Sequence, residues 1–253
     1  MHGLDASGHA PAALNIDAVK SAGHTEMPLY GWTPVTVSGC PSAWAELSTR
    51  FGRLPFADLL QPAISLAEEG FPVSPVVAHQ WQIAFEQFSA RREPAMQAWF
   101  DTFLIDGRAP KAGEIFCNPA QARTLSELAA TRCESFYRGE IARRLDARSQ
   151  ADGGYLRLTD LQSYRPRWVE PISVNYRGYD VWEIPPSGQG LIALMTLQIL
   201  QGFEFDHRDS QQTWHRQIEA LKLAYSDGLH YITDPEYMRV AVADLLSEGY
   251  AQK

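Results

Sequence analysis

Apolar residues recur at helical spacing over much of the first half of the chain. Between residues 41 and 70 they fall three or four positions apart, and Gly52 and Gly70 stand where helices commonly end. We therefore expect two amphipathic helices here, packed against each other as a pair. Their apolar faces are predicted to carry Trp44, Leu47, Phe51, Leu59, Leu60, Ile64 and Leu66.

Capping residues predict the starts of two further helices. Ser74 and Asn118 each stand directly before a proline. A short polar side chain accepts a hydrogen bond from the first turn of a helix, and proline is tolerated at the first helical position. We expect new helices to begin at Pro75 and Pro119.

Turn residues interrupt the helical pattern at several points. Residues 100–116 predict two short extended pieces around the turn Asp106-Gly107. Residues 119–150 predict a pair of helices broken near Gly139. The sequence TDLQ at 159–162 has the spacing of a capping box, which predicts another helix start at its threonine, Thr159.

The period of the pattern changes to two between residues 171 and 186. Ile172, Val174 and Tyr176 alternate with polar residues, the dipeptide Arg177-Gly178 interrupts them, and extended-type residues resume at Tyr179. This pattern predicts a β-hairpin or a bent pair of strands.

Two helices are expected after these strands. Residues 190–200 are apolar on nearly every side, which predicts a buried helix with Ser187 as its N-cap. Residues 214–232 predict a second, amphipathic helix. One face of this second helix carries Ile218, Leu221, Ala224 and Tyr225.

The glycine-rich loop at residues 185–190 invites comparison with nucleotide-binding loops. A phosphate-binding P-loop requires Lys and then Ser or Thr after its last glycine, but Gly190 is followed by Leu191 and Ile192. A dinucleotide-binding loop requires GxGxxG before its helix, and Ala193 stands at the third glycine position. Neither motif fits, so we expect the glycines to let the buried helix approach the strands closely.

Composition narrows the partners and cofactors. The 253 residues carry a net charge of −8, which argues against a nucleic-acid partner because phosphate binding requires a concentrated basic face. No run approaches the roughly twenty apolar residues of a membrane span. The three cysteines form no CxxC pair, and the histidines of the helices have no metal-binding spacing. We expect no metal and no cofactor; the residues considered are Cys40, Cys117, Cys133, His79, His215 and His230.

Several joined motifs resemble the gamma-glutamyltranspeptidase family. The first is TVSGCPSAWAELSTRFGRLPFADLLQPAISLAEEGFPVS at residues 36–74. ADGGYLRLTDLQSYRP (151–166), EPISVNYRGYDVWEIPPSGQG (170–190) and LAYSDGLHYITDPE (223–236) then follow in the order of the family's large subunit. The resemblance covers nearly the whole chain, and the joined motifs are far more specific than any one of them.

The resemblance implies a fold and a mechanism. Members of the family are N-terminal nucleophile hydrolases with an αββα sandwich, so we expect an α+β fold that is mostly helical with a few strands. In the family a precursor cleaves itself, and the new N-terminal Thr of the small subunit attacks a gamma-glutamyl amide such as glutathione. The α-amine of that Thr serves as its base, and the acyl group passes to water or to an acceptor amine.

The resemblance also implies that residues 1–253 form a single incomplete domain. Family members have a substantial segment before the place where this chain starts, and Lys253 comes before the family's cleavage point. No Thr of this sequence has the context of the nucleophile. We therefore expect a large-subunit fragment that contains no catalytic residue, is inactive alone, and has the Thr-led small subunit as its partner.

One departure from the family pattern bears on the substrate. Gamma-glutamyl enzymes of the family carry an Arg in a stretch of the type LD.RE.AP, where its guanidinium holds the substrate's α-carboxylate. Here residues 4–11 read LDASGHAP, which places Ser7 at the position of that Arg. Ser7 offers a hydrogen bond but no charge. His9, two residues further on, can line a substrate pocket or simply be an exposed loop residue.

This variant resembles more closely the branch of the family that includes acylases acting on cephalosporin-type amides. Three functions therefore stay open: cleavage of gamma-glutamyl amides, acylase-like hydrolysis of other amides, and a truncated non-catalytic scaffold. A catalytic part should expose a large apolar face where absent elements pack, whereas a self-sufficient scaffold should not. A second departure, Gly228 after Asp227 where many members have Arg, has no explanation in the sequence.

Overall fold

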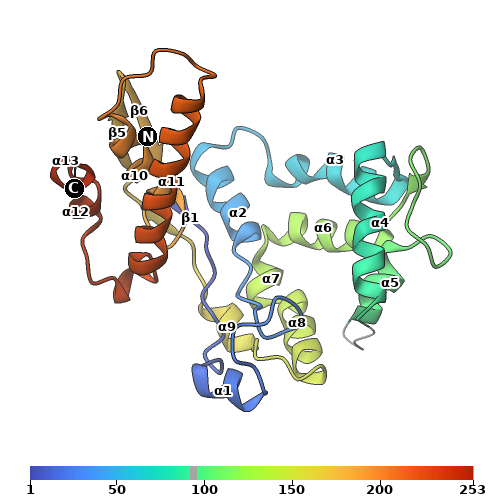
Figure 1. Ribbon diagram of the computed structural model, residues 1–253. Helices are drawn as coiled ribbons and strands as arrows, with labels where there is room; N and C mark the ends of the chain where they lie inside the picture. The colour runs from blue at the N-terminus through green and yellow to red at the C-terminus, as the bar shows by residue number, and fades with distance from the viewer. Residues whose placement is uncertain (92–95, 253) are drawn as a thin grey trace. The chain divides into compact units, whose positions relative to one another are not determined.

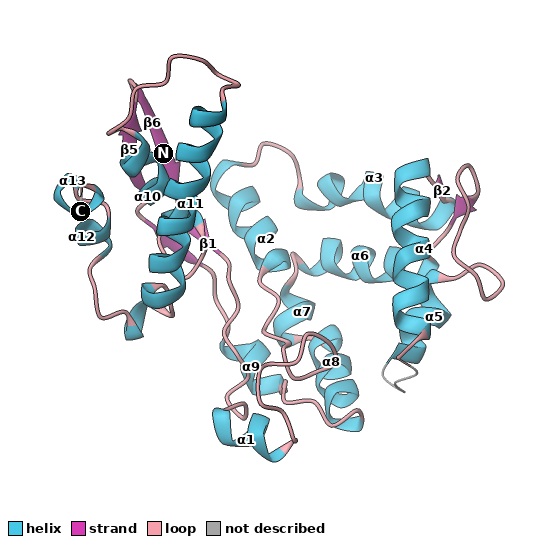
Figure 2. Cartoon of the chain, in the orientation of Figure 1, coloured by secondary structure: helices cyan, strands magenta, loops and turns pink. Residues whose placement is uncertain are grey.

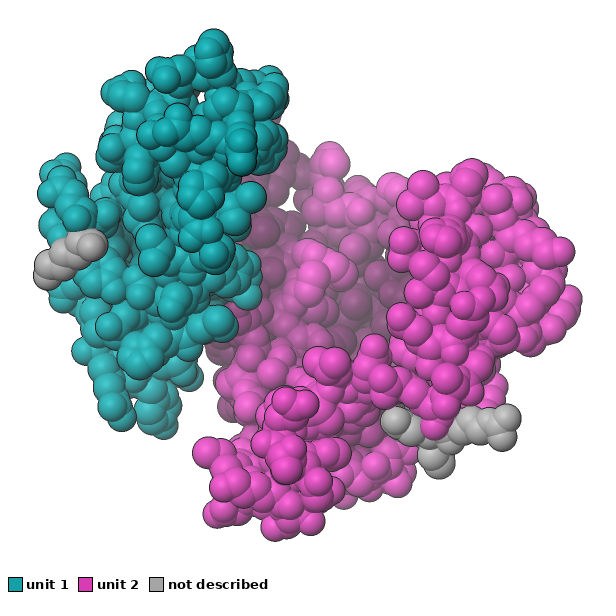
Figure 3. Space-filling view, viewed as in Figure 1, with its two compact units in different colours: residues 1–5, 167–253 teal, residues 6–166 magenta. Residues whose placement is uncertain are grey.

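The chain divides into two compact units in the computed structural model, which describes residues 1–91 and 96–252. Unit 1 comprises residues 1–5 and 167–253, and unit 2 comprises residues 6–166 (Figure 3). The predicted end of the large-subunit segment at Lys253 lies outside the described residues. That residues 1–253 are one incomplete domain stays a prediction.

Unit 2 is mostly helical, as the spacing of its apolar residues predicts (Figures 1 and 2). One antiparallel strand pair, β2 (Phe71–Pro72) with β3 (Ile115–Phe116), interrupts the helices. The described helices of this unit are α1 (Ile16–Ser21), α2 (Cys40–Phe51), α3 (Phe56–Glu69), α4 (Pro75–Ser89), α5 (Gln97–Phe103), α6 (Pro119–Thr131), α7 (Glu134–Arg138), α8 (Glu140–Ala151) and α9 (Leu158–Ser163).

The predicted caps of α4 and α6 are confirmed. The Ser74 hydroxyl accepts a hydrogen bond from the Val77 amide at 3.3 Å, and the Asn118 side chain accepts one from the Gln121 amide at 3.0 Å. Each bond satisfies an amide that the first turn of a helix leaves without a backbone acceptor. The predicted helix ends at Gly52 and Gly70 are confirmed as well.

The predicted pairing of the two helices between residues 41 and 70 is wrong. Both helices form, but the main partner of α3 is α6. Phe56 and Ile64 of α3 pack with Leu125 and Leu128 of α6 in one core cluster. The predicted apolar faces are therefore buried only in part. The side chains left exposed are Trp44, Leu47, Phe51, Leu59 and Leu66.

The breaks between helices were predicted in part. The turn Asp106-Gly107 forms, and β3 supplies the second extended piece, but residues 100–103 belong to helix α5 rather than to an extended piece. The predicted break at Gly139 separates α7 from α8. A further break lies at Arg132-Cys133, where the backbone φ angles are 48° and 67°.

The helix predicted to begin at Thr159 begins one residue earlier, at Leu158. Its first turn is capped by Asp160 rather than by Thr159. The Asp160 carboxylate accepts hydrogen bonds from the Arg157 amide at 2.8 Å and from the Ala12 amide at 3.0 Å. The Asp160 carboxylate caps the first turn of the helix and also binds the distant Ala12 amide. The capping side chain is therefore Asp160, whereas the spacing of TDLQ predicted Thr159.

Unit 1 joins four short strands to a pair of packed helices (Figure 1). β1 pairs with β4, and β5 pairs with β6, both antiparallel. The turn of the β5–β6 hairpin is Arg177-Gly178, with φ angles of 53° and 89°, which confirms the predicted hairpin. The described elements of this unit are β1 (Gly3–Asp5), β4 (Arg167–Val169), β5 (Ile172–Tyr176), β6 (Tyr179–Glu183), α10 (Gly190–Leu200), α11 (Gln211–Tyr231), α12 (Val242–Leu245) and α13 (Glu248–Ala251).

Helix α10 is the buried centre of unit 1, as predicted. Leu191 and Leu194 are completely buried, and α11 packs along it. The predicted N-cap is wrong: Gln189, not Ser187, occupies the cap position, because residues 186–189 turn before the helix begins.

The buried face of α11 is lined by small residues. The helix turns Ala220, Ala224 and Gly228 toward the core. A Cβ on Gly228 would lie only 2.5 Å from the Cδ1 atom of Ile192 on α10. The two helices approach so closely that small residues face α10. Of the four residues predicted to share one face of α11, Ala224 is buried, whereas Ile218, Leu221 and Tyr225 are exposed.

Candidate functional site

The loop that carries the two predicted site residues runs beside residues 37–39. The Val37 amide donates a hydrogen bond of 3.1 Å to the His9 carbonyl. Glycines stand at the two closest approaches: a Cβ on Gly8 would overlap the Val37 carbonyl, and a Cβ on Gly39 would overlap the Ala6 carbonyl. The two segments therefore lie together only because both positions lack a side chain.

Ser7 and His9 both lie on the exposed side of this loop. Each is solvent-exposed, and the His9 ring lies 6.2 Å from the Tyr164 ring, centroid to centroid. The Nδ1 atom of His9 is 3.0 Å from the Ala10 carbonyl oxygen. The structure thus brings the two predicted residues onto one accessible loop, where Ser7 presents a hydroxyl and no positive charge. Their role in binding substrate stays a prediction.

Two tyrosines that sequence reasoning missed support this region. Tyr137 and Tyr164 stack with ring centroids 5.4 Å apart and an interplanar angle of 21°. The Tyr137 hydroxyl donates to the Ser38 carbonyl at 2.7 Å and accepts from the Ser42 amide at 3.1 Å. Burial raises the pKa of Tyr137 well above its ordinary value, so this phenol stays a neutral donor. No short motif signals this pair, because its members belong to different elements.

Asp160 holds the far end of the same loop. Its side chain is only 4 % exposed, and the bond from the Ala12 amide joins residues 148 positions apart. A buried carboxylate that accepts two amide hydrogen bonds is well compensated for its lost hydration. The loop of residues 6–12 is therefore held in its middle, through His9 to Val37, and at its far end, through Ala12 to Asp160.

One glycine of the loop before α10 is required for close packing of the helix. A Cβ on Gly190 would lie 2.5 Å from the Glu183 carboxylate on β6, which confirms that this glycine lets the helix start close against the strand. Gly188 has open space around its Cα, so no such constraint acts there.

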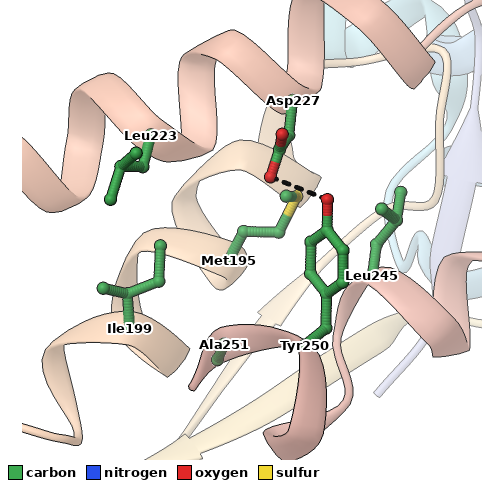
Figure 4. A pocket seen from close by; sticks show the side chains of 7 residues that line it. All are labelled: Met195, Ile199, Leu223, Asp227, Leu245, Tyr250 and Ala251. Carbon is green, nitrogen blue, oxygen red and sulfur yellow. Dashed lines mark hydrogen bonds between the residues drawn. The ribbon is translucent and has the colours of Figure 1, made fainter. Parts of the chain in front are cut away.

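A small apolar hollow lies between α10, α11 and the C-terminal helices of unit 1 (Figure 4). Its volume is about 190 Å³. The Tyr250 hydroxyl donates a hydrogen bond of 3.0 Å to the Asp227 carboxylate at its edge. Burial, together with that carboxylate, raises the pKa of Tyr250 to about 12. The apolar lining residues are Met195, Ile199, Leu223, Leu245 and Ala251.

Neither a metal-ligating cluster nor a membrane-spanning helix is found in the part of the chain that the structure describes. No group of three or more His, Cys, Asp or Glu side chains there is placed to hold a metal ion. Among the same residues, no helix combines the length and the apolar character needed to cross a bilayer.

The fold is that of the N-terminal nucleophile hydrolases related to acylases and transpeptidases. The structure matches cephalosporin acylase from Bacillus halodurans with a TM-score of 0.97 and 52% sequence identity, covering 99% of this chain and 47% of the acylase. It matches gamma-glutamyltranspeptidase from Helicobacter pylori with a TM-score of 0.90 and 24% identity, covering 99% of this chain and 72% of that one. The predicted α+β class, as the mostly helical part of an αββα sandwich, is confirmed.

The family follows from the sequence profile and from curated relatives. The profile of the Gamma-glutamyltranspeptidase family matches residues 1–253. The chain is 36% identical over 251 residues to the oxamate amidohydrolase proenzyme of Klebsiella pneumoniae, covering 96% of this chain and 46% of that protein. It is 32% identical over 250 residues to a glutathione hydrolase-like proenzyme of Bacillus subtilis, covering 98% of this chain and 47% of that protein.

The chain therefore belongs to the gamma-glutamyltranspeptidase family, as its motifs predicted, and to the acylase-like branch of that family. The family consists of hydrolases and transpeptidases. The chain spans about half the length of the curated relatives that it matches.

Proposed function

We propose that the chain is the large-subunit part of an acylase-type amide hydrolase, completed by a Thr-led small subunit. The observation that carries this proposal is Ser7. It stands exposed on a loop that is held through His9 and Ala12, at the position where gamma-glutamyl enzymes carry the Arg that binds the substrate's α-carboxylate. A hydroxyl at this position provides one hydrogen bond and no bidentate ion pair, so the recognition of an amino-acid head group is weakened.

The proposed reaction needs both subunits. The Thr hydroxyl of the partner attacks the amide carbon, and the α-amine of the same Thr takes up the hydroxyl proton. That proton passes to the leaving nitrogen as the carbon–nitrogen bond breaks. Water then attacks the acyl ester, which releases the acid and regenerates the Thr. In this scheme the present chain contributes the substrate-facing loop of Ser7 and His9.

The surface of unit 1 supports the need for a partner. Along α11 the side chains at 214, 218, 221, 225 and 229 form one stripe, because these positions are spaced three or four residues apart. Their exposed fractions range from 40% to 84%. We call Trp214, Ile218, Leu221, Tyr225 and Leu229 the α11 stripe. Exposed apolar surface of this kind commonly marks an interface.

The strands of unit 1 support the same conclusion. Each of its described sheets has two strands, and none of these strands exceeds five residues. Two-stranded sheets of this size are marginal in water and gain stability when further strands or a helix cover them. An αββα sandwich completed by a second subunit would supply such cover.

The experiment compares two chromogenic amides on the protein purified with its small subunit. Gamma-glutamyl-p-nitroanilide and glutaryl-p-nitroanilide differ only in the α-amino group of the acyl part. We expect kcat/KM for the glutaryl amide to equal or exceed that for the gamma-glutamyl amide. We expect Ser7→Arg to raise kcat/KM for both amides by about tenfold or more, the effect of one charge-assisted contact, because both acyl parts carry the carboxylate that a guanidinium binds. Ser7→Ala, which adds no charge, is the control.

A strong preference for the gamma-glutamyl amide in the unaltered protein would favour the second candidate, a gamma-glutamyl hydrolase or transpeptidase. Similarity to the glutathione hydrolase proenzyme of Pseudomonas aeruginosa, at 32% identity over 263 residues, is the observation on its side. If the protein has no Thr-led partner and cleaves neither amide, the proposal is wrong and the scaffold reading stands.

A further inference from the structure

The loop that carries Ser7 is held through its main chain. The His9 carbonyl accepts a hydrogen bond from the Val37 amide at 3.1 Å, and the Ala12 amide donates one to the Asp160 carboxylate at 3.0 Å. Both bonds use backbone atoms of the loop, so neither depends on the side chain that stands at position 7. A different side chain can therefore stand there on the same backbone.

Asp160 uses its two carboxylate oxygens for two separate segments. Its Oδ2 atom accepts from the Arg157 amide at 2.8 Å and caps α9, whereas its Oδ1 atom accepts from the Ala12 amide. The side chain is 4% exposed, so little water competes for either bond. A cap needs only one acceptor. The second bond of Asp160 therefore serves the loop rather than the helix.

The two anchors of the loop belong to one core cluster. Leu161, which follows Asp160 on α9, is completely buried, and Tyr164 is 4% exposed. Both side chains pack in the cluster that contains Val37, whose amide is the other anchor. The Pro11 ring of the loop itself is fully buried. Because a close-packed interior yields little, the two anchors stay at a fixed distance from each other.

Tyr137 fixes the segment that lies next to the loop. Its hydroxyl donates to the Ser38 carbonyl at 2.7 Å and accepts from the Ser42 amide at 3.1 Å, and the residue is only 2% exposed. Between these two bonds lies Gly39, where a Cβ would overlap the Ala6 carbonyl of the loop. The segment and the loop are so close that a shift of one displaces the other.

We propose that Asp160 and Tyr137 are positioning residues of the substrate site. They fix the backbone of the loop, and with it the direction in which residue 7 points, before a substrate arrives. Neither side chain contacts the substrate in this scheme. A loop that is already ordered loses little conformational entropy on binding, so loosening it weakens binding. The inference rests on the proposed amide-hydrolase function and adds the residues that hold its substrate loop.

Hydrogen–deuterium exchange of the protein purified with its small subunit tests the hold on the loop. Asp160→Ala removes both acceptor oxygens, so the Ala12 amide loses its partner. We expect peptides that cover residues 6–12 to exchange about tenfold faster or more in this variant. Leu128→Ala is the matched control, because Leu128 is buried in the other core cluster of unit 2. It should leave the exchange of the loop within about twofold.

Steady-state kinetics with glutaryl-p-nitroanilide tests whether the hold matters for the substrate. A merely destabilised enzyme has fewer active molecules, which lowers the apparent kcat and leaves KM unchanged. We expect Asp160→Ala to raise KM about tenfold or more, Tyr137→Phe to raise it by a smaller factor, and Leu128→Ala to leave it within about twofold. The gain in kcat/KM expected from Ser7→Arg should fall below about twofold in the Asp160→Ala background, since a guanidinium on a loosened loop is no longer aligned with the substrate.

Unchanged exchange of the loop in Asp160→Ala overturns the inference, and so does faster exchange with KM and the gain from Ser7→Arg unaltered. An equal rise of KM in Leu128→Ala overturns it as well. If Asp160→Ala does not fold, Tyr137→Phe decides by the same measurements. An enzyme that cleaves neither amide contradicts the proposed function. The exchange measurement then decides the inference alone: faster exchange supports it and unchanged exchange overturns it.

Discussion

Helices α6 and α11 carry apolar residues at the same spacing, yet they bury opposite kinds of side chain. On α6 the residues Leu125 and Leu128 lie in the core of unit 2. On α11 the core side consists of Ala220, Ala224 and Gly228, and the large apolar residues of the α11 stripe are exposed. Helix α6 buries its apolar stripe inside its own unit, whereas helix α11 exposes its apolar stripe to solvent.

The comparison shows that the spacing of apolar residues predicts a helix but does not predict which of its faces is buried. Both patterns specify a helix, but the partner on the buried side decides which residues fit. Helix α3 offers α6 a surface into which leucines pack, whereas α10 approaches α11 so closely that Gly228 lies against Ile192. Covering each half-exposed residue of the α11 stripe would contribute about 1 kcal/mol or more, which favours association with a partner.

The largest expected effect is a cavity in the core that α6 builds. Leu128→Ala should lower the free energy of unfolding by about 2–5 kcal/mol, because Leu128 is 3% exposed and its neighbours cannot fully close the space. Urea denaturation measures the change. Leu221→Ala on α11 is the matched control and should cost well under 1 kcal/mol in the chain without its partner. Equal losses from the two changes would contradict the contrast between the helices.

Charged substitutions in the α11 stripe should weaken association with the small subunit rather than the folding of the chain. Ile218→Glu with Leu221→Glu should weaken binding of the small subunit by at least tenfold, since a charge must then lose its hydration in an apolar interface. Gln212→Glu with Ser226→Glu adds the same two charges at exposed positions of the helix outside the stripe and serves as control. Affinity is measured by titration of the purified subunits. Unchanged affinity in the double variant would show that the stripe is not the contact surface.

The close approach of α10 and α11 should be sensitive to a single methyl group. Gly228→Ala should cost about 1–3 kcal/mol of unfolding free energy, because the new Cβ meets the Ile192 side chain at 2.5 Å. Ile192→Ala removes both atoms that the new Cβ meets, Cδ1 and Cγ1, so the double variant should lose less stability than the sum of the two single changes. A stabilising Gly228→Ala would mean that helix propensity outweighs the contact. The same contact accounts for the departure from Arg at this position, since a long side chain has no room there.

The smallest expected effect is an alkaline loss of stability at the end of α11. Tyr250 donates to Asp227, and its pKa is raised from 10.0 to about 12 in the folded chain. A raised pKa means that the folded state favours the neutral phenol, so this stabilisation is complete below pH 10 and is lost as the pH rises toward 12. Tyr250→Phe should remove this part of the pH dependence. Denaturation curves at pH 9 and pH 11 for both proteins test it, and identical pH dependence would contradict it.

Of the candidate site, only the loop of residues 6–12 could be predicted from the sequence. The motif at residues 4–11 pointed to Ser7 and His9, and the structure places both on one exposed loop. The groups that hold the loop were not predictable, because Asp160 meets Ala12 across 148 positions and Tyr164 stacks on Tyr137 from another element.

The sequence by itself determined the features whose contacts join residues only a few positions apart in the chain. The caps at Ser74 and Asn118 and the hairpin turn at Arg177-Gly178 form from neighbours in the chain, and the joined motifs determined the family. Only the tertiary structure decided that α3 packs on α6 and that α11 turns its small residues inward. A cap needs one nearby amide, whereas the choice of a buried face depends on the volume that distant residues leave free.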